Sequence, residues 1–279
     1  VPYTATVNIG ADREAWLDPN DIVFDDDVDW FAPTEWKGCV MARPAPFDES
    51  DTPPATEPFD SFFYATDTDN VWPAVNEANG AQNNGTGPNL GCGPEITSLR
   101  NNKGEIEDAI DEMLPWHRGG TTGNLGLVWG WRALSPNWRG LWGDGTPATM
   151  PLDYNSASSD KVIVMLTDGD NQFYDNPPSG PDGSDVTAYG RLGEFGFASL
   201  HAANVEIDER MARACTAMKT QGVILYTITF GSSPDAATQQ LYSDCATSAG
   251  HYFHSPSNGD LSDIFKAIGR QLSELRIAQ

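Results

Sequence analysis

One uninterrupted apolar stretch, residues 162–166, stands out in the pattern of hydrophobic and polar positions along the chain. It is rich in β-branched residues and lies between Lys161 and the sequence Thr167-Asp168-Gly169. A run of this length and composition is typical of a strand that is buried on both faces of a parallel sheet. We therefore expect a central strand here. Its end places Asp168 at the carboxyl edge of the sheet, where open α/β folds bind ligands.

The chain downstream of this stretch alternates between helical and extended patterns. Apolar side chains recur every three or four positions in the expected helices, and apolar or β-branched residues dominate the expected strands. The predicted helices are 205–221, 233–248 and 261–275, and the predicted strands are 223–230 and 251–253. Such alternation is typical of an α/β fold with a doubly wound, mostly parallel sheet.

Two segments upstream of the apolar stretch have a regular pattern. Residues 2–9 alternate between apolar and polar, which predicts a strand with one solvent-exposed face. Residues 104–114 have apolar side chains at helical spacing, which predicts a helix that packs against the rest of the domain. The stretch 12–100 is rich in proline, asparagine and glycine with little periodicity, which indicates an inserted, loop-rich subdomain. We therefore expect a strand within 1–11, this insertion, and the remainder of the same domain at 101–279.

Two features are expected to hold the insertion together, a small aromatic core and a disulfide. The four cysteines form no Cys-x-x-Cys or Cys/His cluster, so two disulfides in an oxidising compartment are expected rather than a zinc site. Three connectivities are possible, and closeness in sequence favours Cys39 with Cys92 and Cys215 with Cys245; free buried thiols are the alternative. The aromatic residues of the expected core are Trp30, Phe31, Trp36, Phe59, Phe62, Phe63, Tyr64 and Trp72.

Composition narrows the range of partners. The chain of 279 residues has 40 Asp and Glu against 16 Lys and Arg, which gives a net charge of −24. A surface this anionic argues against nucleic acid and anionic membranes as partners, and it suits divalent cations or a saline exterior better. No run of about 18 apolar residues is present, so no membrane span is expected within this chain. Without a signal peptide or an initiator methionine, the chain is expected to be a processed or excised piece.

A second motif precedes the expected central strand. Gly119-Gly120-Thr121-Thr122-Gly123 forms a glycine-rich turn that leads into an apolar helix through Trp131. The simplest role for Thr121 and Thr122 is to cap that helix, and the simplest role for Asp168 is to cap a helix or shape a turn. A hydroxyl and a carboxylate at one sheet edge can instead provide oxygen ligands to a hard cation.

Taken together, the Gly-Gly-Thr turn before a helix and the buried strand ending in Thr-Asp-Gly resemble the von Willebrand factor type A (VWA) domain. The resemblance implies a metal-ion-dependent adhesion site (MIDAS), in which Thr121 and Asp168 would be the second and third elements. Thr122 is the fallback for Thr121 if the turn is offset by one residue, and Asp170 is the fallback for Asp168. The implied cofactor is a divalent cation, Mg²⁺ or Ca²⁺, that accepts a carboxylate from a partner protein.

A more specific resemblance runs along the whole chain. The sequence is similar to the TadG-like proteins of bacterial Tad (Flp) pilus assembly, which have Trp-Gly-x-Arg followed by Leu-Ser-Pro and an inserted, cysteine-containing loop. The resemblance implies a protein of the bacterial cell envelope or cell surface, anchored by an upstream N-terminal helix, whose partners are other pilus or envelope proteins. The matching segments are Trp36-Lys37-Gly38-Cys39-Val40, Arg43-Pro44, Val128-Trp129-Gly130-Trp131-Arg132, Leu134-Ser135-Pro136, Leu166-Thr167-Asp168-Gly169 and Leu275-Arg276.

One part of the family pattern is missing. The first metal motif, Asp-x-Ser-x-Ser after an apolar strand, does not occur, and the nearest string, Asp48-Glu49-Ser50-Asp51-Thr52, lies in a proline-rich loop without a preceding strand. In the VWA fold that the chain resembles, the strands are ordered 3-2-1-4-5-6, and the resemblance implies that residues 3–9 are strand 3 and residues 162–166 are strand 4. We therefore expect an upstream N-terminal fragment to supply strands 1 and 2 and the first metal ligands, docked between these two strands.

Two classes of function follow from these observations. In the first, the chain is a non-enzymatic module of pilus assembly or adhesion that binds a protein ligand through the metal site. A structural pilus or surface component with an incomplete or lost site is its rival. In the second class, which is less favoured, Asp168 and a histidine form a metal-assisted hydrolase site, although no Gly-x-Ser-x-Gly elbow, phosphate loop or His-Glu-x-x-His motif is present. The histidines considered are His117, His201, His251 and His254.

Overall fold

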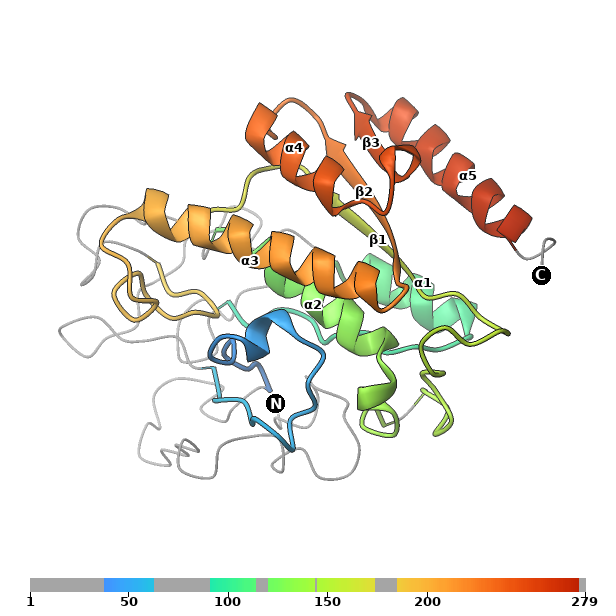
Figure 1. Cartoon of the computed structure of the whole chain (residues 1–279), viewed down its shortest axis with the longest axis horizontal. Helices are drawn as coiled ribbons and strands as arrows, with labels where there is room; N and C mark the ends of the chain where they lie inside the picture. The colour runs from blue at the N-terminus through green and yellow to red at the C-terminus, as the bar shows by residue number, and fades with distance from the viewer. Residues whose placement is uncertain (1–37, 63–90, 114–119, 144, 174–184, 276–279) are drawn as a thin grey trace.

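The described part of the chain contains a small parallel sheet with helices on both of its faces (Figure 1). This computed structural model describes residues 38–62, 91–113, 120–143, 145–173 and 185–275. The α-helices of this part are α1 (Lys103–Asp111), α2 (Gly123–Leu134), α3 (Leu200–Thr220), α4 (Ala236–Cys245) and α5 (Asn258–Leu275). The strands are β1 (Val162–Thr167), β2 (Ile224–Phe230) and β3 (Tyr252–Ser255), and the short 3-10 helices are η3 (Phe47–Glu49), η4 (Pro136–Trp138) and η5 (Ala249–His251).

The strands β1, β2 and β3 pair side by side in sequence order, and both pairs are parallel. Val164 of β1 lies opposite Tyr226 of β2, and Ile228 of β2 lies opposite Phe253 of β3. The strands predicted for this half of the chain and the parallel α/β class are therefore confirmed. The further strands of a doubly wound sheet stay a prediction.

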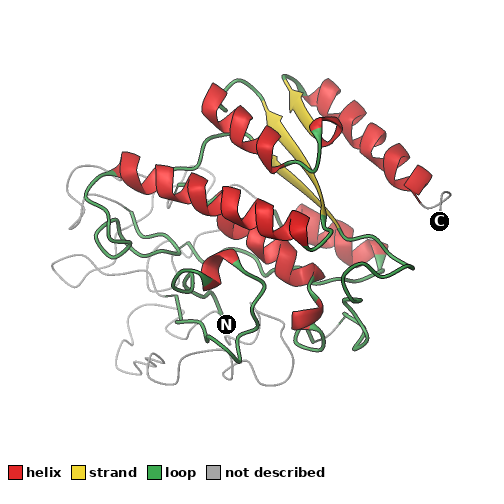
Figure 2. Cartoon of the chain, in the orientation of Figure 1, coloured by secondary structure: helices red, strands yellow, loops and turns green. Residues whose placement is uncertain are grey.

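Helices cover the two faces of the sheet (Figure 2). On one face, α2, α3 and α4 form the main core, in which Val128, Met211 and Leu225 are fully buried. On the other face, α5 packs Ile268 against Tyr226 and other apolar residues of β2 and β3. Successive side chains of a strand point to opposite faces, so β2 contributes to both layers.

β1 is less buried than its composition predicts. Among the described residues it lies at an edge of the sheet, next to β2 only. Val164 and Leu166 are 39 % and 42 % exposed, although both were expected to be buried. Composition indicates that a strand is suited to burial on both faces, but it does not show which other segment covers it. The predicted burial of these two side chains is therefore corrected, whereas the central position of β1 stays a prediction, because the strands expected on its other side are not among the described residues.

α1 is present but does not pack as predicted. Asn102 caps its first turn by accepting a hydrogen bond from Gly104 N (3.1 Å), and none of its side chains is buried. Ile106 and Ile110, which belong to its apolar stripe, are 37 % and 55 % exposed. Helical spacing reports which residues share a face, and it does not guarantee a neighbour for that face.

Capping residues set where the next helices begin. Ser199 accepts a hydrogen bond from Ala202 N (3.2 Å), so α3 begins well before the predicted start at 205. Asp235 accepts one from Thr238 N (2.8 Å), which starts α4 later than the predicted 233. Ser and Asp are favoured at this position because they satisfy main-chain N–H groups of the first turn. The buried face predicted for α3 is confirmed and contains Ile207, Met211, Ala214 and Met218.

The described part of the insertion packs on the rest of the domain. Phe59 is buried and stacks on Trp129 of α2, with 5.3 Å between the ring centroids, and it meets Trp138 edge-on. Phe62 is also buried and packs against Val186. The aromatic core of this segment is thus shared with α2 and η4. The other aromatic residues predicted for it, Trp30, Phe31, Trp36, Phe63, Tyr64 and Trp72, lie outside the described residues.

Buried and partly buried polar groups fix the same segment in place. Asp51 Oδ2 accepts hydrogen bonds from Ser135 Oγ, from Asn137 Nδ2 (3.0 Å) and from Tyr154 Oη (2.7 Å). Arg43 is 2 % exposed and donates to main-chain carbonyl groups of its own segment. Burial lowers the pKa of Arg43 to about 10. These bonds replace the hydration that the buried charges lose on folding.

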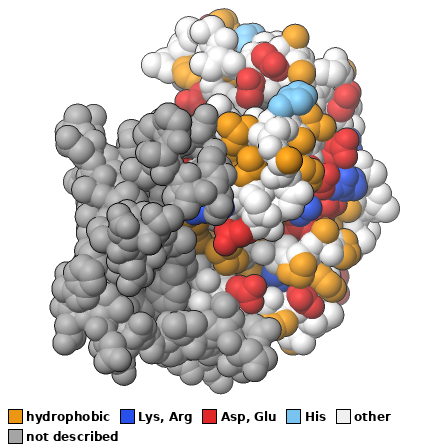
Figure 3. Space-filling view, turned by 90° about the vertical axis from the view of Figure 1, so that its left-hand side faces the viewer, with side chains coloured by type: hydrophobic (Ala, Val, Ile, Leu, Met, Phe, Trp, Pro, Cys, Tyr) orange, Lys and Arg blue, Asp and Glu red, His pale blue; other side chains and the backbone are white. Residues whose placement is uncertain are grey.

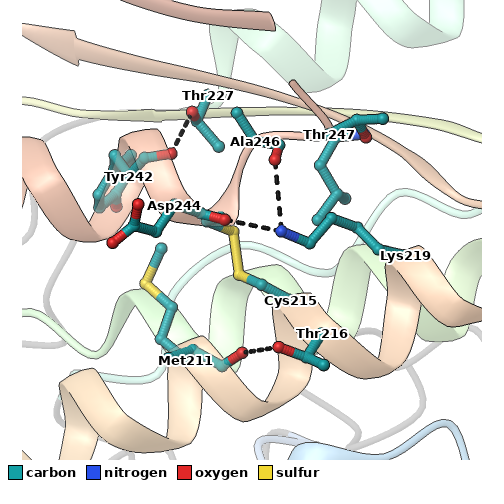
Figure 4. Close-up of a disulfide and its surroundings, with 12 residues drawn as sticks. Met211, Cys215, Thr216, Lys219, Thr227, Tyr242, Asp244, Ala246 and Thr247 are labelled. Atoms are coloured by element: carbon teal, nitrogen blue, oxygen red, sulfur yellow. Dashed lines mark hydrogen bonds between the residues drawn. A yellow bond between two sulfur atoms is a disulfide. The ribbon is translucent and has the colours of Figure 1, made fainter. Parts of the chain in front are cut away.

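Both favoured disulfides are present, Cys39–Cys92 and Cys215–Cys245. Figure 4 shows the second, which joins α3 to α4 beside Lys219. Lys219 Nζ reinforces this connection by donating to Asp244 O (2.6 Å). The alternative of free thiols is excluded. Two disulfides indicate an oxidising environment such as the periplasm or the cell exterior.

Two sequence-based expectations concern other parts of the chain. The predicted strand at 2–9 lies outside the described residues, as does His117. Among the helices that the structure does describe, none has the length and apolarity required to cross a membrane.

Candidate functional site

Asp168 lies in the loop that follows β1, at the carboxyl end of the sheet. Thr167 forms the turn there, because its Oγ1 donates to Gly169 O (2.7 Å) and accepts from Gly169 N (3.3 Å). The Asp168 side chain is exposed, and its carboxylate makes no hydrogen bond to any residue that the structure describes. Asp168 therefore neither caps a helix nor shapes the turn, and its oxygens are available to a ligand.

The glycine-rich turn meets this loop through the main chain. Thr121 N donates to Gln172 O (2.7 Å), and Gln172 N donates to Thr121 O (2.8 Å). The structure thus brings the two sequence motifs to the same edge of the sheet. Thr121 is exposed and Thr122 is partly buried. Their role as metal ligands, like that of Asp168 and its fallback Asp170, stays a prediction.

Asn171 connects the two motifs, and sequence reasoning missed this role. Its Oδ1 accepts a hydrogen bond from Gly123 N (2.9 Å), and its Nδ2 donates to Asp208 Oδ1 (2.8 Å). Asn171 is 6 % exposed, so both bonds are shielded from water. Thr122 occupies the N-cap position of α2 but makes no side-chain capping bond. The prediction that threonine hydroxyls cap this helix is therefore wrong, because an amide from a distant loop takes that place.

We expect Gly123→Ala to destabilise this connection. A Cβ at this position would lie 2.8 Å from Asn171 Oδ1 and 3.1 Å from Met165 Cε, so the capping amide would have to move. Loss of a helix cap costs about 0.5–2 kcal/mol of stability. Chemical denaturation of the variant measures this change in the free energy of unfolding.

Gly126→Ala is the matched control for this variant. Gly126 lies in the same helix and is exposed, and an added Cβ would have nothing within 4 Å. Alanine is favoured over glycine inside a helix, so this variant should be about 0.5–1 kcal/mol more stable than the unaltered chain. Similar effects of the two substitutions would contradict the capping role of Asn171.

Carboxylates make the surroundings of the two motifs acidic. Asp170 Oδ1 accepts a hydrogen bond from Asp235 N (3.0 Å), and Asp208 lies near both residues. Burial and the charges of Asp170 and Asp235 raise the pKa of Asp208, although its hydrogen bond to Asn171 acts in the opposite direction. This electrostatic environment favours a cation or a positively charged group of a ligand. On the side of the molecule seen in Figure 3, acidic side chains are scattered among hydrophobic ones.

The described residues do not complete a metal site. Within them, no three side chains of His, Cys, Asp or Glu are grouped so that they could hold an ion. Thr121 and Asp168 provide one side chain each, whereas Mg²⁺ and Ca²⁺ take six or more oxygen ligands. The string 48–52, which the sequence already excludes as a metal motif, has structural partners: Asp48 bonds to Tyr189 and Arg210.

The three described histidines have hydrogen-bond partners or positions away from Asp168. His251 Nδ1 lies 2.7 Å from Ser248 Oγ, and His254 Nδ1 lies 3.0 Å from Thr229 Oγ1. His201 is exposed at the start of α3. None of these described histidines makes a hydrogen bond to Asp168. Within the described ranges, no histidine is therefore paired with Asp168 as an acid–base pair would require, and His117 lies outside those ranges.

Comparisons with known proteins give distant similarities only. No protein-family model matches the chain, and no curated protein sequence matches it. Among solved structures, it is similar to proximal thread matrix protein 1 (PTMP1) from the mussel byssus. The structure of PTMP1 with a zinc-occupied MIDAS motif aligns with 63 % of this chain and 30 % of its own, at 18 % identity and a TM-score of 0.34. A second crystal form aligns with 63 % and 29 %, at 18 % identity and a TM-score of 0.32.

The chain therefore spans less than a third of the length of these PTMP1 structures. At such TM-scores the fold has to be judged from the sheet and helices of the chain itself. Those elements establish a mixed α/β domain with a parallel sheet and two disulfides.

Proposed function

We propose that this chain is a non-enzymatic binding domain of a cell-envelope or surface protein that acts in pilus assembly or adhesion. Its protein ligand would bind at the carboxyl edge of the sheet. The observation that carries the proposal is the meeting of the Thr121 turn with the Asp168 loop, where the Asp168 carboxylate is exposed and uncommitted. Open α/β sheets bind their ligands at this edge.

The proposal includes a divalent cation, Mg²⁺ or Ca²⁺, at Asp168 and Thr121. Carboxylate and hydroxyl oxygens are the hard ligands that these ions prefer. Because the described residues do not complete the site, the other ligands would have to come from elsewhere, such as an upstream fragment of the same protein. Partners of this kind, and other pilus or envelope proteins, are part of the proposal.

A structural domain without a working metal site is the second candidate. The absence of an ion-holding group among the described residues favours it. Under this alternative, the two disulfides and the buried polar bonds of segment 38–62 serve a mechanical role in the cell surface. The two candidates differ in a measurable property, which is the affinity of the chain for cations.

Asp168→Ala is expected to abolish binding of divalent cations while leaving the fold intact, because this side chain lies outside the core. Calorimetric titration of the complete protein with Mg²⁺, Ca²⁺ and Mn²⁺ measures the affinity, and thermal unfolding checks the fold. Asp160→Ala is the matched control, since Asp160 is exposed at the opposite end of the same strand. It should retain the affinity of the unaltered protein.

Two outcomes would decide against the metal site. Unchanged affinity in the Asp168 variant would place the cation elsewhere. A complete protein that binds none of the three cations at millimolar concentration would support the structural candidate.

A further inference from the structure

The main-chain bridge between the Thr121 turn and the Asp168 loop lies at the surface. Thr121 and Gln172 exchange two hydrogen bonds, but both residues are exposed, so water competes for these bonds. Within the described residues the bridge stands apart from the strands of the sheet. Exposed hydrogen bonds of this kind open at little free-energy cost. The bridge alone therefore does not hold the two motifs at a fixed separation.

Asn171 provides a shielded connection directly beside this bridge. It precedes Gln172 and is 6 % exposed. Its Oδ1 accepts a hydrogen bond from Gly123 N (2.9 Å), at the first residue of α2, and its Nδ2 donates to Asp208 Oδ1 (2.8 Å) on α3. α2 and α3 pack against each other (Figure 1). One side chain thus joins the loop after β1 to two packed helices.

The two partners of Asn171 require an amide between them. Gly123 N can only donate, and an ionised carboxylate can only accept, so the side chain that bonds to both has to offer one acceptor and one donor. Aspartate at this position would bring a second negative charge to Asp208. Leucine, which has a similar size, would leave both partners without their bond. The same two contacts fix the orientation of the amide.

The start of α2 is closely surrounded at the point where Asn171 reaches it. A Cβ at Gly123 would lie 2.8 Å from Asn171 Oδ1, 3.1 Å from Met165 Cε and 3.4 Å from Tyr242 Oη. The loop, β1 and α4 therefore all contact this residue closely. Thr121 lies two positions before Gly123, and Asp168 lies three positions before Asn171. The bond between Asn171 and Gly123 therefore sets how far apart the two proposed ligands are held.

We infer that Asn171 is a positioning residue for the cation site, and that Asp208 is the group through which α3 acts on that site. This inference rests on the proposed function, because it concerns the site that Thr121 and Asp168 would form. Asn171 would act without binding the ion, since its amide is engaged by Gly123 and Asp208. Groups that orient the ligands of a metal ion affect its affinity although they do not touch it.

Asn171→Leu is the direct test, because it removes both bonds without changing the charge near the site. Calorimetric titration of the complete protein with Mg²⁺ should show an affinity roughly tenfold or more weaker than that of the unaltered protein. Hydrogen exchange at the main-chain amides of Thr121 and Gln172, measured in EDTA, should be roughly tenfold faster. The exchange measurement needs no cation, so it tests the positioning role separately from the proposed function.

Exchanging the two side chains provides a conservative rescue. The double variant Asn171→Asp/Asp208→Asn keeps one amide, one carboxylate and the net charge, and it reverses the direction of the hydrogen bond between α3 and the loop. Its affinity for Mg²⁺ should return to within about threefold of that of the unaltered protein. Asn171→Asp alone places two carboxylates face to face. It should bind Mg²⁺ more weakly than the double variant, although its extra negative charge by itself would favour a cation.

Tyr154→Phe is the matched control for a loss of stability. It removes a partly buried hydroxyl that bonds to Asp51 Oδ2 (2.7 Å) and to Trp131 Nε1 (2.7 Å), near the opposite end of α2. Thermal unfolding should show that this variant is less stable than the unaltered protein. Its Mg²⁺ affinity and its exchange at Thr121 and Gln172 should be unchanged, because the sheet edge is not altered.

The outcomes separate the positioning role from the proposed function. Unchanged exchange in Asn171→Leu would overturn the positioning role, and so would a Mg²⁺ affinity equal to that of Tyr154→Phe. If Asn171→Leu does not fold, equal affinities of Asn171→Asp and the double variant would overturn it instead. An unaltered protein that binds no cation would refute the proposed function and the effect of Asn171 on affinity together. The exchange rates would still decide whether Asn171 holds the two motifs.

Discussion

Replacing Asp48 with alanine is expected to lower the free energy of unfolding by about 3–5 kcal/mol. The Asp48 side chain is completely buried, and its Oδ2 accepts hydrogen bonds from Tyr189 Oη (2.8 Å) and from Arg210 Nη1. Without the carboxylate, Arg210, whose side chain is 13 % exposed, would lose this buried partner and keep its pair with Glu206. Chemical denaturation followed by tryptophan fluorescence measures the loss.

Two further variants identify the cause of this loss. Asp153→Ala removes an ion pair with Arg139 in which the Asp153 side chain is 79 % exposed, and it should cost less than about 1 kcal/mol. Asp48→Asn keeps an acceptor for the Tyr189 hydroxyl and removes the charge, so its cost should be intermediate. If Asp48→Ala costs no more than Asp153→Ala, the buried pair does not hold η3 against α3.

The double variant Cys215→Ala/Cys245→Ala is expected to be less stable than the unaltered protein by about 3–4 kcal/mol. The disulfide links residues that are 30 positions apart, and its loss would raise the conformational entropy of the unfolded chain. Alanine is the appropriate replacement because both sulfurs lie in the apolar core, where a serine hydroxyl would be buried. Denaturation under non-reducing conditions measures the difference.

Val205→Ala provides the comparison on the same helix. Val205 is exposed on α3, and its truncation should change stability by no more than about 0.5 kcal/mol. A cysteine double variant that is as stable as Val205→Ala would mean that the native disulfide contributes nothing net. In that case, strain that the disulfide causes in the folded state would have to offset the stabilisation that it gives by lowering the conformational entropy of the unfolded chain.

Regular hydrophobic spacing made much of the described fold predictable. The stripe of Ile207, Met211 and Met218 indicated α3, and the apolar run of β2 indicated a buried strand. Both signals arise from neighbours in sequence, since a helix or strand has to bury one continuous face. The position of Asp168 followed in the same way, because a parallel strand delivers its next residues to a known edge of the sheet.

Polar contacts between distant segments could not be predicted in this way. Local preference favoured Thr121 or Thr122 as the cap of α2, yet Asn171 provides it from 48 positions further along the chain. Nothing in the neighbourhood of Gly123 indicates that an amide will arrive there. The same reasoning applies to Asp51, whose bonds to Ser135 and its neighbours depend on packing of the whole insertion.

The solvent exposure of apolar side chains was the other property that the hydrophobic pattern alone could not predict. Val164 and Ile110 are apolar residues at positions suited to burial, and both are exposed. Sequence shows that a face prefers to be covered, whereas burial also requires a second surface in the right place. That is why the predictions of a strand and a helix are confirmed, while the predicted burial of both is wrong.

The bond between Asp48 and Arg210 also bears on when the chain can acquire its structure. The two residues are 162 positions apart, and Arg132, which donates to Phe47 O, is 85 positions from that group. At about 5–20 residues per second, roughly 10–30 s of synthesis separate Asp48 from Arg210. During that interval the segment around η3 has no α3 to pack against. Its folding therefore waits for most of the chain to be made, and the long loops that must close make the step slow.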